Sequence, residues 1–134
     1  MCVVFVYSED YAQFDYGRHH PLRLFRLKLA FDLMKSYGLL DAPAEMVKPP
    51  LASEEVLVNF HSIEYLEALR CAEEKGELHP QHGLGGEENP VFPGVYTFSR
   101  LVVGGTFYAL QKALQNCRVS VSYTHLTLPT KRIV

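Results

Sequence analysis

One segment, residues 22–37, limits the possible folds of this chain more than any other because its pattern is strongly helical. Pro21 stands where a helix can begin, since proline lacks an N–H that would go unpaired there, and Gly38 stands where a helix can end. At about 100° per residue, the side facing water carries three charges as an ion-pair ladder: Lys28, Asp32 and Lys35. The segment therefore predicts a helix whose other side is packed.

Arg26 falls inside the apolar side of this predicted helix, which consists of Leu22, Leu24, Leu27, Leu29, Ala30, Phe31, Leu33 and Met34. A guanidinium keeps its charge, so burial requires a carboxylate, several carbonyls or a water-filled cavity. The pattern alone leaves two interpretations open. Arg26 either extends to the surface or pairs with an acid for structural reasons, or it lines an internal polar channel.

The first half of the chain predicts one strand and two further helices. Residues 2–7 are β-branched and apolar on both faces, as in the interior of a parallel sheet. Residues 39–50 contain three prolines and are expected to form a connector without a helix. Ser53 and Ser62 are each expected to cap a helix, and Gly76 lies just beyond the end of the second.

The second half predicts a long loop, a last helix and a tail. Residues 76–93 are irregular, and loops of this length are more often functional than idle. A helix is expected over 96–115, where Gly104-Gly105 would let another backbone approach closely. The alternating pattern of Val119, Val121 and Tyr123 favours a strand.

Composition excludes several classes of function. Of the 134 residues, 48% are apolar and 21% charged, which is typical of one globular domain, and the net charge of −2 offers no attraction to nucleic acid or to an anionic membrane. No apolar run has the length of a membrane span and no signal peptide is expected. Three widely separated cysteines without a Cys-x-x-Cys pair indicate a reducing, cytoplasmic setting and no thiolate metal site.

Six motifs, in this order and at natural spacing over roughly residues 2–116, resemble the N-terminal part of the histone deacetylase family, and within it the bacterial acetoin-utilisation members. They are Tyr7-Ser-Glu-Asp-Tyr11, Tyr16-Gly-Arg-His-His-Pro21, Arg26, Phe60-His-Ser-Ile-Glu-Tyr65, Asn89-Pro-Val-Phe-Pro-Gly94 and Gly104-Gly105. Each motif alone is a weak signal, whereas the ordered set is a strong one. Residues 117–134 fall outside the resemblance and are interpreted as a non-native tail, because the family's Gly-Gly-x-His-His motif does not follow.

The resemblance implies an α/β fold, the N-terminal part of the arginase/deacetylase-like three-layer architecture. That architecture is a parallel sheet flanked by helices, truncated here and therefore mostly helical, with the active site at the carboxyl ends of the strands. It also implies zinc-dependent hydrolysis of an acetylated amine, normally acetyl-lysine. In the family a zinc ion bound by Asp-x-His and a distant aspartate activates water, a His-His pair transfers protons and a tyrosine binds the oxyanion.

None of these catalytic groups is expected in this chain. Its four aspartates all lack a histidine two positions later, and the pair His19-His20 is preceded by Arg18, so it is interpreted as part of a loop at a helix start. The pair His79 and His82 could hold a metal, but the sequence fixes no acid or cysteine beside it. We therefore expect no catalytic residue and no bound metal, with zinc belonging to the full-length family.

Three residues match positions outside the catalytic set. Glu88 stands where the family places an acid that grips the substrate backbone at the mouth of the pocket, although many members use aspartate there. Arg26 matches an arginine of the internal channel through which acetate leaves, and Tyr7 matches a tyrosine that lines the same cavity. His61 is expected to cap or pack between two helices.

The expected function is that of a fragment of a deacetylase similar to the bacterial acetoin-utilisation members, acting on an acetylated protein, without nucleic acid or membrane partners. Two alternatives stay open at this point. One is a deacetylase for acetylpolyamine or another small acetylated amine, and the other is a non-catalytic binding or structural domain.

Overall fold

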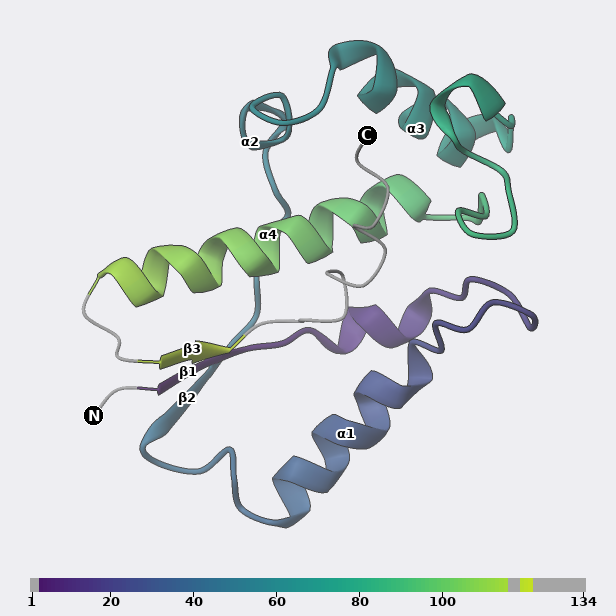
Figure 1. Cartoon of the computed structure of the whole chain (residues 1–134). Coiled ribbons are helices and arrows are strands. Elements are labelled where there is room, and N and C mark those ends of the chain that lie inside the picture. The colour runs from purple at the N-terminus through teal and green to yellow at the C-terminus, as the bar shows by residue number, and fades with distance from the viewer. Residues whose placement is uncertain (1–2, 116–118, 122–134) are drawn as a thin grey trace.

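The computed structural model describes residues 3–115 and 119–121 (Figure 1). In chain order the elements are β1 (Val3–Val6), the 3-10 helix η1 (Glu9–Gln13), α1 (Phe25–Ser36), β2 (Ala44–Val47), α2 (Glu54–Leu57), α3 (Ile63–Lys75), the 3-10 helix η2 (Pro80–His82), α4 (Val95–Leu114) and β3 (Val119–Val121).

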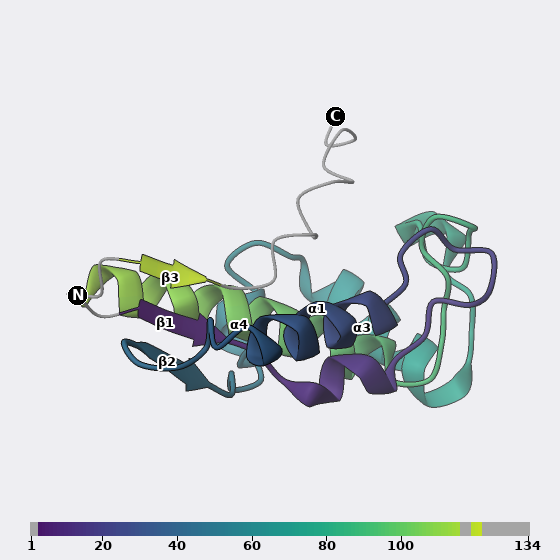
Figure 2. The ribbon, with the colours of Figure 1, turned by 90° about the horizontal axis from the view of Figure 1, so that it is seen from below.

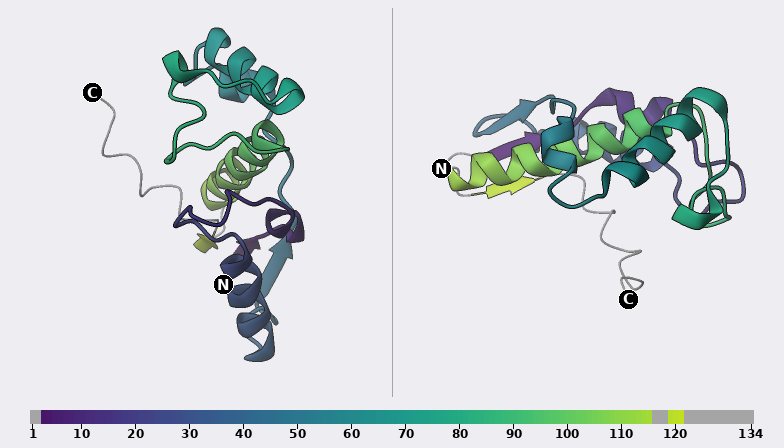
Figure 3. Two further views of the ribbon diagram at one scale, coloured as in Figure 1. Left: turned by 90° about the vertical axis from the view of Figure 1, so that its right-hand side faces the viewer. Right: turned by 90° about the horizontal axis from the view of Figure 1, so that it is seen from above.

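The three strands form a parallel sheet in the order β2-β1-β3, and Figure 2 shows them side by side. Val3 pairs with both Ala44 of β2 and Val119 of β3. Alternate residues of β1 face opposite sides: Val4 and Val6 are buried in one cluster with Ala109 of α4, whereas the Phe5 ring stacks 6.5 Å from Phe31 of α1. The sheet therefore lies between α4 and α1, with α2 and α3 on the outer side of α4 (Figures 1 and 3), which confirms the predicted three-layer α/β class.

Two of the three strands lie where the sequence carries weak or no strand signals. The chain was expected to supply one strand with residues 39–50 as a connector, and that is wrong, because β2 lies within them. Its sequence, Ala-Glu-Met-Val, carries no strand pattern of its own, and pairing with β1 decides its conformation. The strand expected from Val119 and Val121 is confirmed as β3; Tyr123 lies outside the described residues.

The helix expected from residue 22 begins later, at Phe25. The reason is local: the Leu22 N–H donates to Nδ1 of His20 at 3.1 Å, so a side chain satisfies the backbone in place of a helical turn. The other end agrees with expectation, since Gly38 follows the helix with a φ of 67°. On the water side, Lys28 and Asp32 form an ion pair at 2.7 Å.

The expected helix caps in the α2 and α3 region are confirmed. The Ser53 hydroxyl accepts the Val56 N–H at 3.4 Å, and the Ser62 hydroxyl accepts the Tyr65 N–H at 3.3 Å. Gly76 ends α3 in the left-handed conformation. These serine caps set where the two helices begin.

The first turn of α4 is capped by another helix. Gly94 at its N-cap provides no side chain, and the Glu73 carboxylate of α3 instead accepts the Thr97 N–H at 2.9 Å and the Thr97 hydroxyl at 3.0 Å. A negative charge at a helix N-terminus also interacts favourably with the helix dipole. Glu73 thus joins α3 to the start of α4.

Replacing Glu73 with alanine should lower the free energy of unfolding by about 1–3 kcal/mol, because two charge-assisted hydrogen bonds and a helix cap disappear together. The matched control is Glu74→Ala, since Glu74 is exposed on the same helix and should change stability by less than about 0.5 kcal/mol. Urea unfolding followed by circular dichroism measures both. Equal effects of the two variants would contradict the capping role.

Candidate functional site

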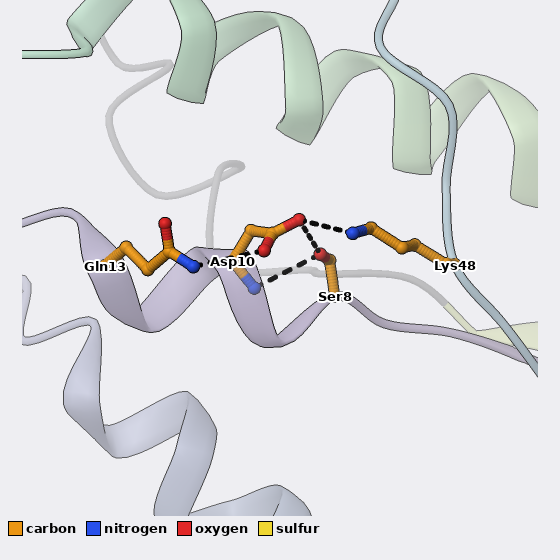
Figure 4. A network of polar contacts seen from close by, with 4 residues as sticks. All are labelled: Ser8, Asp10, Gln13 and Lys48. Carbon is orange, nitrogen blue, oxygen red and sulfur yellow. Dashed lines mark hydrogen bonds and ion pairs between the residues drawn. The ribbon is translucent and has the colours of Figure 1, made fainter.

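The carboxyl edge of the sheet carries a polar network that joins the ends of β1 and β2 (Figure 4). Just after β1, the buried Ser8 hydroxyl donates to Asp10 Oδ2 at 3.0 Å and accepts the Asp10 N–H at 3.2 Å. Just after β2, Lys48 Nζ lies 2.7 Å from the same Oδ2, and Gln13 donates to Oδ1 at 3.2 Å. The hydrogen bond from Lys48, with that from Ser8, lowers the pKa of the Asp10 carboxyl. Parallel α/β sheets place ligand sites at this edge.

Tyr7 continues β1 toward this edge, with its N–H donating to the Val47 carbonyl at 3.0 Å. Its half-buried ring stacks on Phe31 with centroids 4.2 Å apart and planes 9° apart. The phenolic oxygen is buried and has no hydrogen-bond partner in the described part of the chain. Burial, and then the negative charge of Glu9, raise the pKa of Tyr7, so the group is a neutral donor at physiological pH.

The expectation that Arg26 lies in a buried apolar side of the helix is wrong for this chain. Arg26 is exposed, and so are Leu29 and Leu33 of the same side, at 53% and 58%. Within α1 only Phe31 is buried, and Leu27 one turn earlier is partly buried, because the described residues cover only that part of the helix. Arg26 also makes no hydrogen bond to the Tyr7 hydroxyl. A role for these two residues in an internal channel stays a prediction.

A second part of the candidate site is formed by two loops far apart in the chain. Nε2 of His20 lies 3.2 Å from the Glu88 carbonyl oxygen, and Nδ1 of the same ring accepts the Leu22 N–H. The ring therefore donates through Nε2–H to Glu88. Tyr16 stacks on His20 at 4.7 Å and contacts Phe92 at 4.8 Å. These contacts hold the loop of residues 17–22 against the loop that carries Glu88.

Glu88 itself is exposed on this loop, and its role at the mouth of a substrate pocket stays a prediction. The loop is closed by a backbone hydrogen bond of 2.8 Å from the Gly85 N–H to the Asn89 carbonyl. The two loops, residues 17–22 and 85–89, form the rim, and sequence reasoning missed His20 as the residue that joins them. The signal lay in the motif Tyr16-Gly-Arg-His-His-Pro21, where the second histidine and the tyrosine stack on each other.

His61 lies where it was expected, beside the start of α3. Its half-buried ring stacks on Tyr65 at 5.2 Å and contacts the Phe60 ring edge-on at 4.9 Å. Burial lowers the pKa of His61, which favours the neutral imidazole. The residue therefore packs against the start of α3.

A third group of polar residues corrects an expectation from the sequence. The histidine segment 79–82 was interpreted as lacking an acid or a cysteine beside it, yet the fold brings Cys71 and Glu77 close to His79. One ligand atom of each lies within 4.8 Å of the other two. The grouping could not be seen in the sequence, because Cys71 lies on α3 whereas Glu77 and His79 follow the chain reversal at the end of that helix.

The fold and the geometry define the class of this protein: a parallel α/β protein with polar groups gathered at the carboxyl edge of its sheet and a loop rim nearby. Residues 20–125 match the model of the histone deacetylase domain. The chain belongs to the histone deacetylase family, which is a zinc-dependent deacetylase family.

Similar proteins and solved structures support this family assignment. The acetoin utilization protein AcuC of Bacillus subtilis is 38% identical over 112 residues, which are 79% of this chain and 28% of that protein. Histone deacetylase HDAC1 of Drosophila melanogaster is 32% identical, covering 82% of this chain and 22% of that protein. The crystal structure of an HDAC homolog complexed with SAHA superposes with a TM-score of 0.77 at 29% identity, over 86% of this chain and 32% of that one. An HDAC homolog from Aquifex aeolicus gives 0.73 at 31% identity, with the same coverage.

The chain spans less than a third of the length of these relatives. The family match extends to residue 125, past the limit of 116 drawn from the motifs, and the division of the chain into 1–116 and 117–134 stays a prediction. Within the described ranges, none of the helices combines the length and the apolar character needed to cross a membrane.

The residues present do not fit the catalytic zinc site that the resemblance describes. That site uses an Asp-x-His pair, and none of the four aspartates in the sequence has a histidine two positions later. In the described part of the chain, the group of residues that could hold a metal ion is Cys71, Glu77 and His79, a different donor set at the end of α3. No catalytic step is therefore assigned to a metal here.

Proposed function

We propose that this chain is part of an AcuC-like zinc-dependent deacetylase that hydrolyses the amide of acetyl-lysine in the cytoplasm, in the context of acetoin utilisation. The observation that carries the proposal is the loop rim joined by His20 and Glu88, because it brings the motif Tyr16–Pro21 against the residue directly before the motif Asn89–Gly94. The 38% identity to AcuC supports it. Nothing in the comparisons favours the small-amine deacetylase or the non-catalytic domain.

In this function the chain supplies one lip of the substrate pocket. The Glu88 carboxylate accepts hydrogen bonds from the backbone N–H groups of an acetylated protein, and His20 holds the loop by its contact with the Glu88 carbonyl. The carboxylate is exposed and free to reach a substrate. Tyr7 and Arg26 serve an internal channel for acetate, and the buried, unpaired Tyr7 hydroxyl supports that role because it needs a polar neighbour.

The 134-residue protein by itself should not hydrolyse acetyl-lysine, because the zinc ligands and the His-His pair of the family are absent from its sequence. A fluorogenic acetyl-lysine peptide, with zinc supplied, tests this against a sample without protein. Turnover that a chelator abolishes would contradict the expected inactivity.

The role of the rim is tested in a chimera in which residues 1–115 replace the matching part of Bacillus subtilis AcuC. The chimera should deacetylate, and Glu88→Ala within it should lower kcat/KM about 10- to 100-fold, as expected for lost hydrogen bonds to a charge. The matched control is Glu87→Ala, which removes the neighbouring exposed acid and should change kcat/KM less than about twofold. Equal losses in both variants would contradict the assignment of Glu88.

A further inference from the structure

The end of α3 gathers a thiol, a carboxylate and an imidazole away from the rim. Cys71 lies in the last turns of α3, and Glu77 and His79 follow it, with one ligand atom of each within 4.8 Å of the others. We propose that these three side chains bind a zinc ion. The proposal replaces the sequence-based expectation that the chain binds no metal, and it does not depend on the deacetylase function.

The reversal at Gly76 creates this cluster. Gly76 has a φ of 68°, a conformation that other residues rarely adopt, and its N–H donates to the Ala72 carbonyl at 3.0 Å. The chain therefore turns back along the helix, and the Cys71 thiol lies 3.2 Å from Glu77 Oε2. A cysteine in the body of the helix and an acid six residues later thus come into direct contact.

The backbone holds His79 in place. Its carbonyl accepts the His82 N–H at 2.9 Å and the Leu84 N–H at 3.1 Å, and Leu84 is anchored in the core at 6% exposure. Nε2 of His79 is buried and has no hydrogen-bond partner within the described residues. A buried polar atom without a partner is costly, and a metal ion would provide one.

The second ring nitrogen of His79 has a neighbour that could orient it. Nδ1 lies 3.4 Å from the side-chain nitrogen of Gln81. Since the oxygen and nitrogen of a glutamine amide exchange places by a simple flip, Gln81 can accept an Nδ1–H. Metal-bound histidines usually donate their other N–H to such an acceptor, which fixes the ring.

The donor set selects zinc among the common metals. A thiolate and an imidazole favour zinc over magnesium or calcium, which prefer oxygen ligands, and three protein ligands leave a fourth tetrahedral position for water. Zinc–ligand bonds of about 2.0–2.3 Å place ligand atoms roughly 3.5 Å apart. The Cys71 and Glu77 atoms, 3.2 Å apart, already have about this spacing, so only a separation near the 4.8 Å limit has to close, by about 1 Å. The exposed Glu77 side chain can make that movement. The Cys71 thiol releases its proton to solvent as the zinc–sulfur bond forms.

The test uses the full 134-residue chain with Cys2→Ser and Cys117→Ser, because those two thiols lie outside the described residues and could bind zinc themselves. Chelator-treated protein is titrated with zinc chloride in competition with a chromogenic chelator. We expect one equivalent to bind. With cobalt chloride in place of zinc, we expect the near-ultraviolet charge-transfer band of a thiolate ligand.

In the same background, Cys71→Ser and His79→Gln should each weaken zinc binding at least tenfold. The matched controls are Glu74→Gln, on the same helix, and His82→Gln, in the same turn, and both should keep the affinity of the parent. Absence of a one-equivalent site in the parent, or equal affinity in all four variants, would overturn the proposal.

A second measurement keeps all three proposed ligands in place, so it does not depend on whether the substituted variants fold. Zinc chloride should slow the alkylation of Cys71 by iodoacetamide at least tenfold in the parent background, because the bound thiolate is no longer free to react. Magnesium chloride at the same concentration should leave the rate unchanged. An alkylation rate that zinc does not alter would also overturn the proposal.

Discussion

Replacing Phe98 with alanine should lower the free energy of unfolding by about 3–5 kcal/mol, the largest effect expected of any single substitution in this chain. The Phe98 side chain is 1% exposed and lies at the centre of an aromatic cluster. Its ring centroid is 5.1–6.4 Å from those of four other rings: Tyr11, Phe14, Tyr16 and Phe92. Alanine would leave a cavity that rigid rings cannot close. Urea unfolding followed by tyrosine fluorescence measures the change.

The matched control for this prediction is Phe60→Ala, the same chemical change at a side chain that is 78% exposed. It should alter stability by less than about 1 kcal/mol, since little packing is lost. A small effect at Phe98, similar to that at Phe60, would show that the aromatic cluster is not the core of the fold. Because the Tyr16 ring contacts both Phe98 and His20, the same substitution should also loosen the rim.

The elements that could be predicted from the sequence are those whose signals are local. Ser53 and Ser62 cap their helices because a hydroxyl reaches N–H groups only two or three residues away. The strand β1 was predicted because its residues suit a parallel interior on both faces. By contrast, β2 depends on pairing with β1, and its four residues contain no local signal for that pairing.

The candidate site also combines features with local sequence signals and contacts between residues far apart in the chain. The position of Glu88 on an exposed loop followed from motif and turn chemistry, whereas the contact between His20 and the Glu88 carbonyl joins residues 68 apart and could not be derived from spacing. The expected burial of the helix side that carries Arg26 was wrong for a related reason. An apolar helix side shows that something can cover it, but the described residues of this chain cover only the part around Phe31.

For Gly104, the residue pattern predicts a close approach of another backbone, but only the structure identifies the approaching segment. The pair Gly104-Gly105 predicted that another backbone approaches this helix, and for Gly104 the prediction is confirmed. The approaching segment is residues 50–52. A β-carbon at Gly104 would overlap the Pro50 carbonyl oxygen and lie 2.8 Å from the Ala52 nitrogen. The crossing is fixed by two hydrogen bonds between Ala52 and Arg100, of 3.0 and 2.8 Å.

Gly104→Ala should therefore destabilise the protein by about 1–3 kcal/mol, although alanine favours a helix over glycine by about 1 kcal/mol, because backbone atoms cannot move aside as a flexible side chain does. Gly104→Val should cost more. Gly86→Ala is the matched control: nothing lies within 4 Å of a β-carbon there, so stability should stay equal or rise slightly. Thermal unfolding followed by circular dichroism compares the three. A Gly104→Ala variant more stable than the parent would mean that residues 50–52 do not cross α4 at this point.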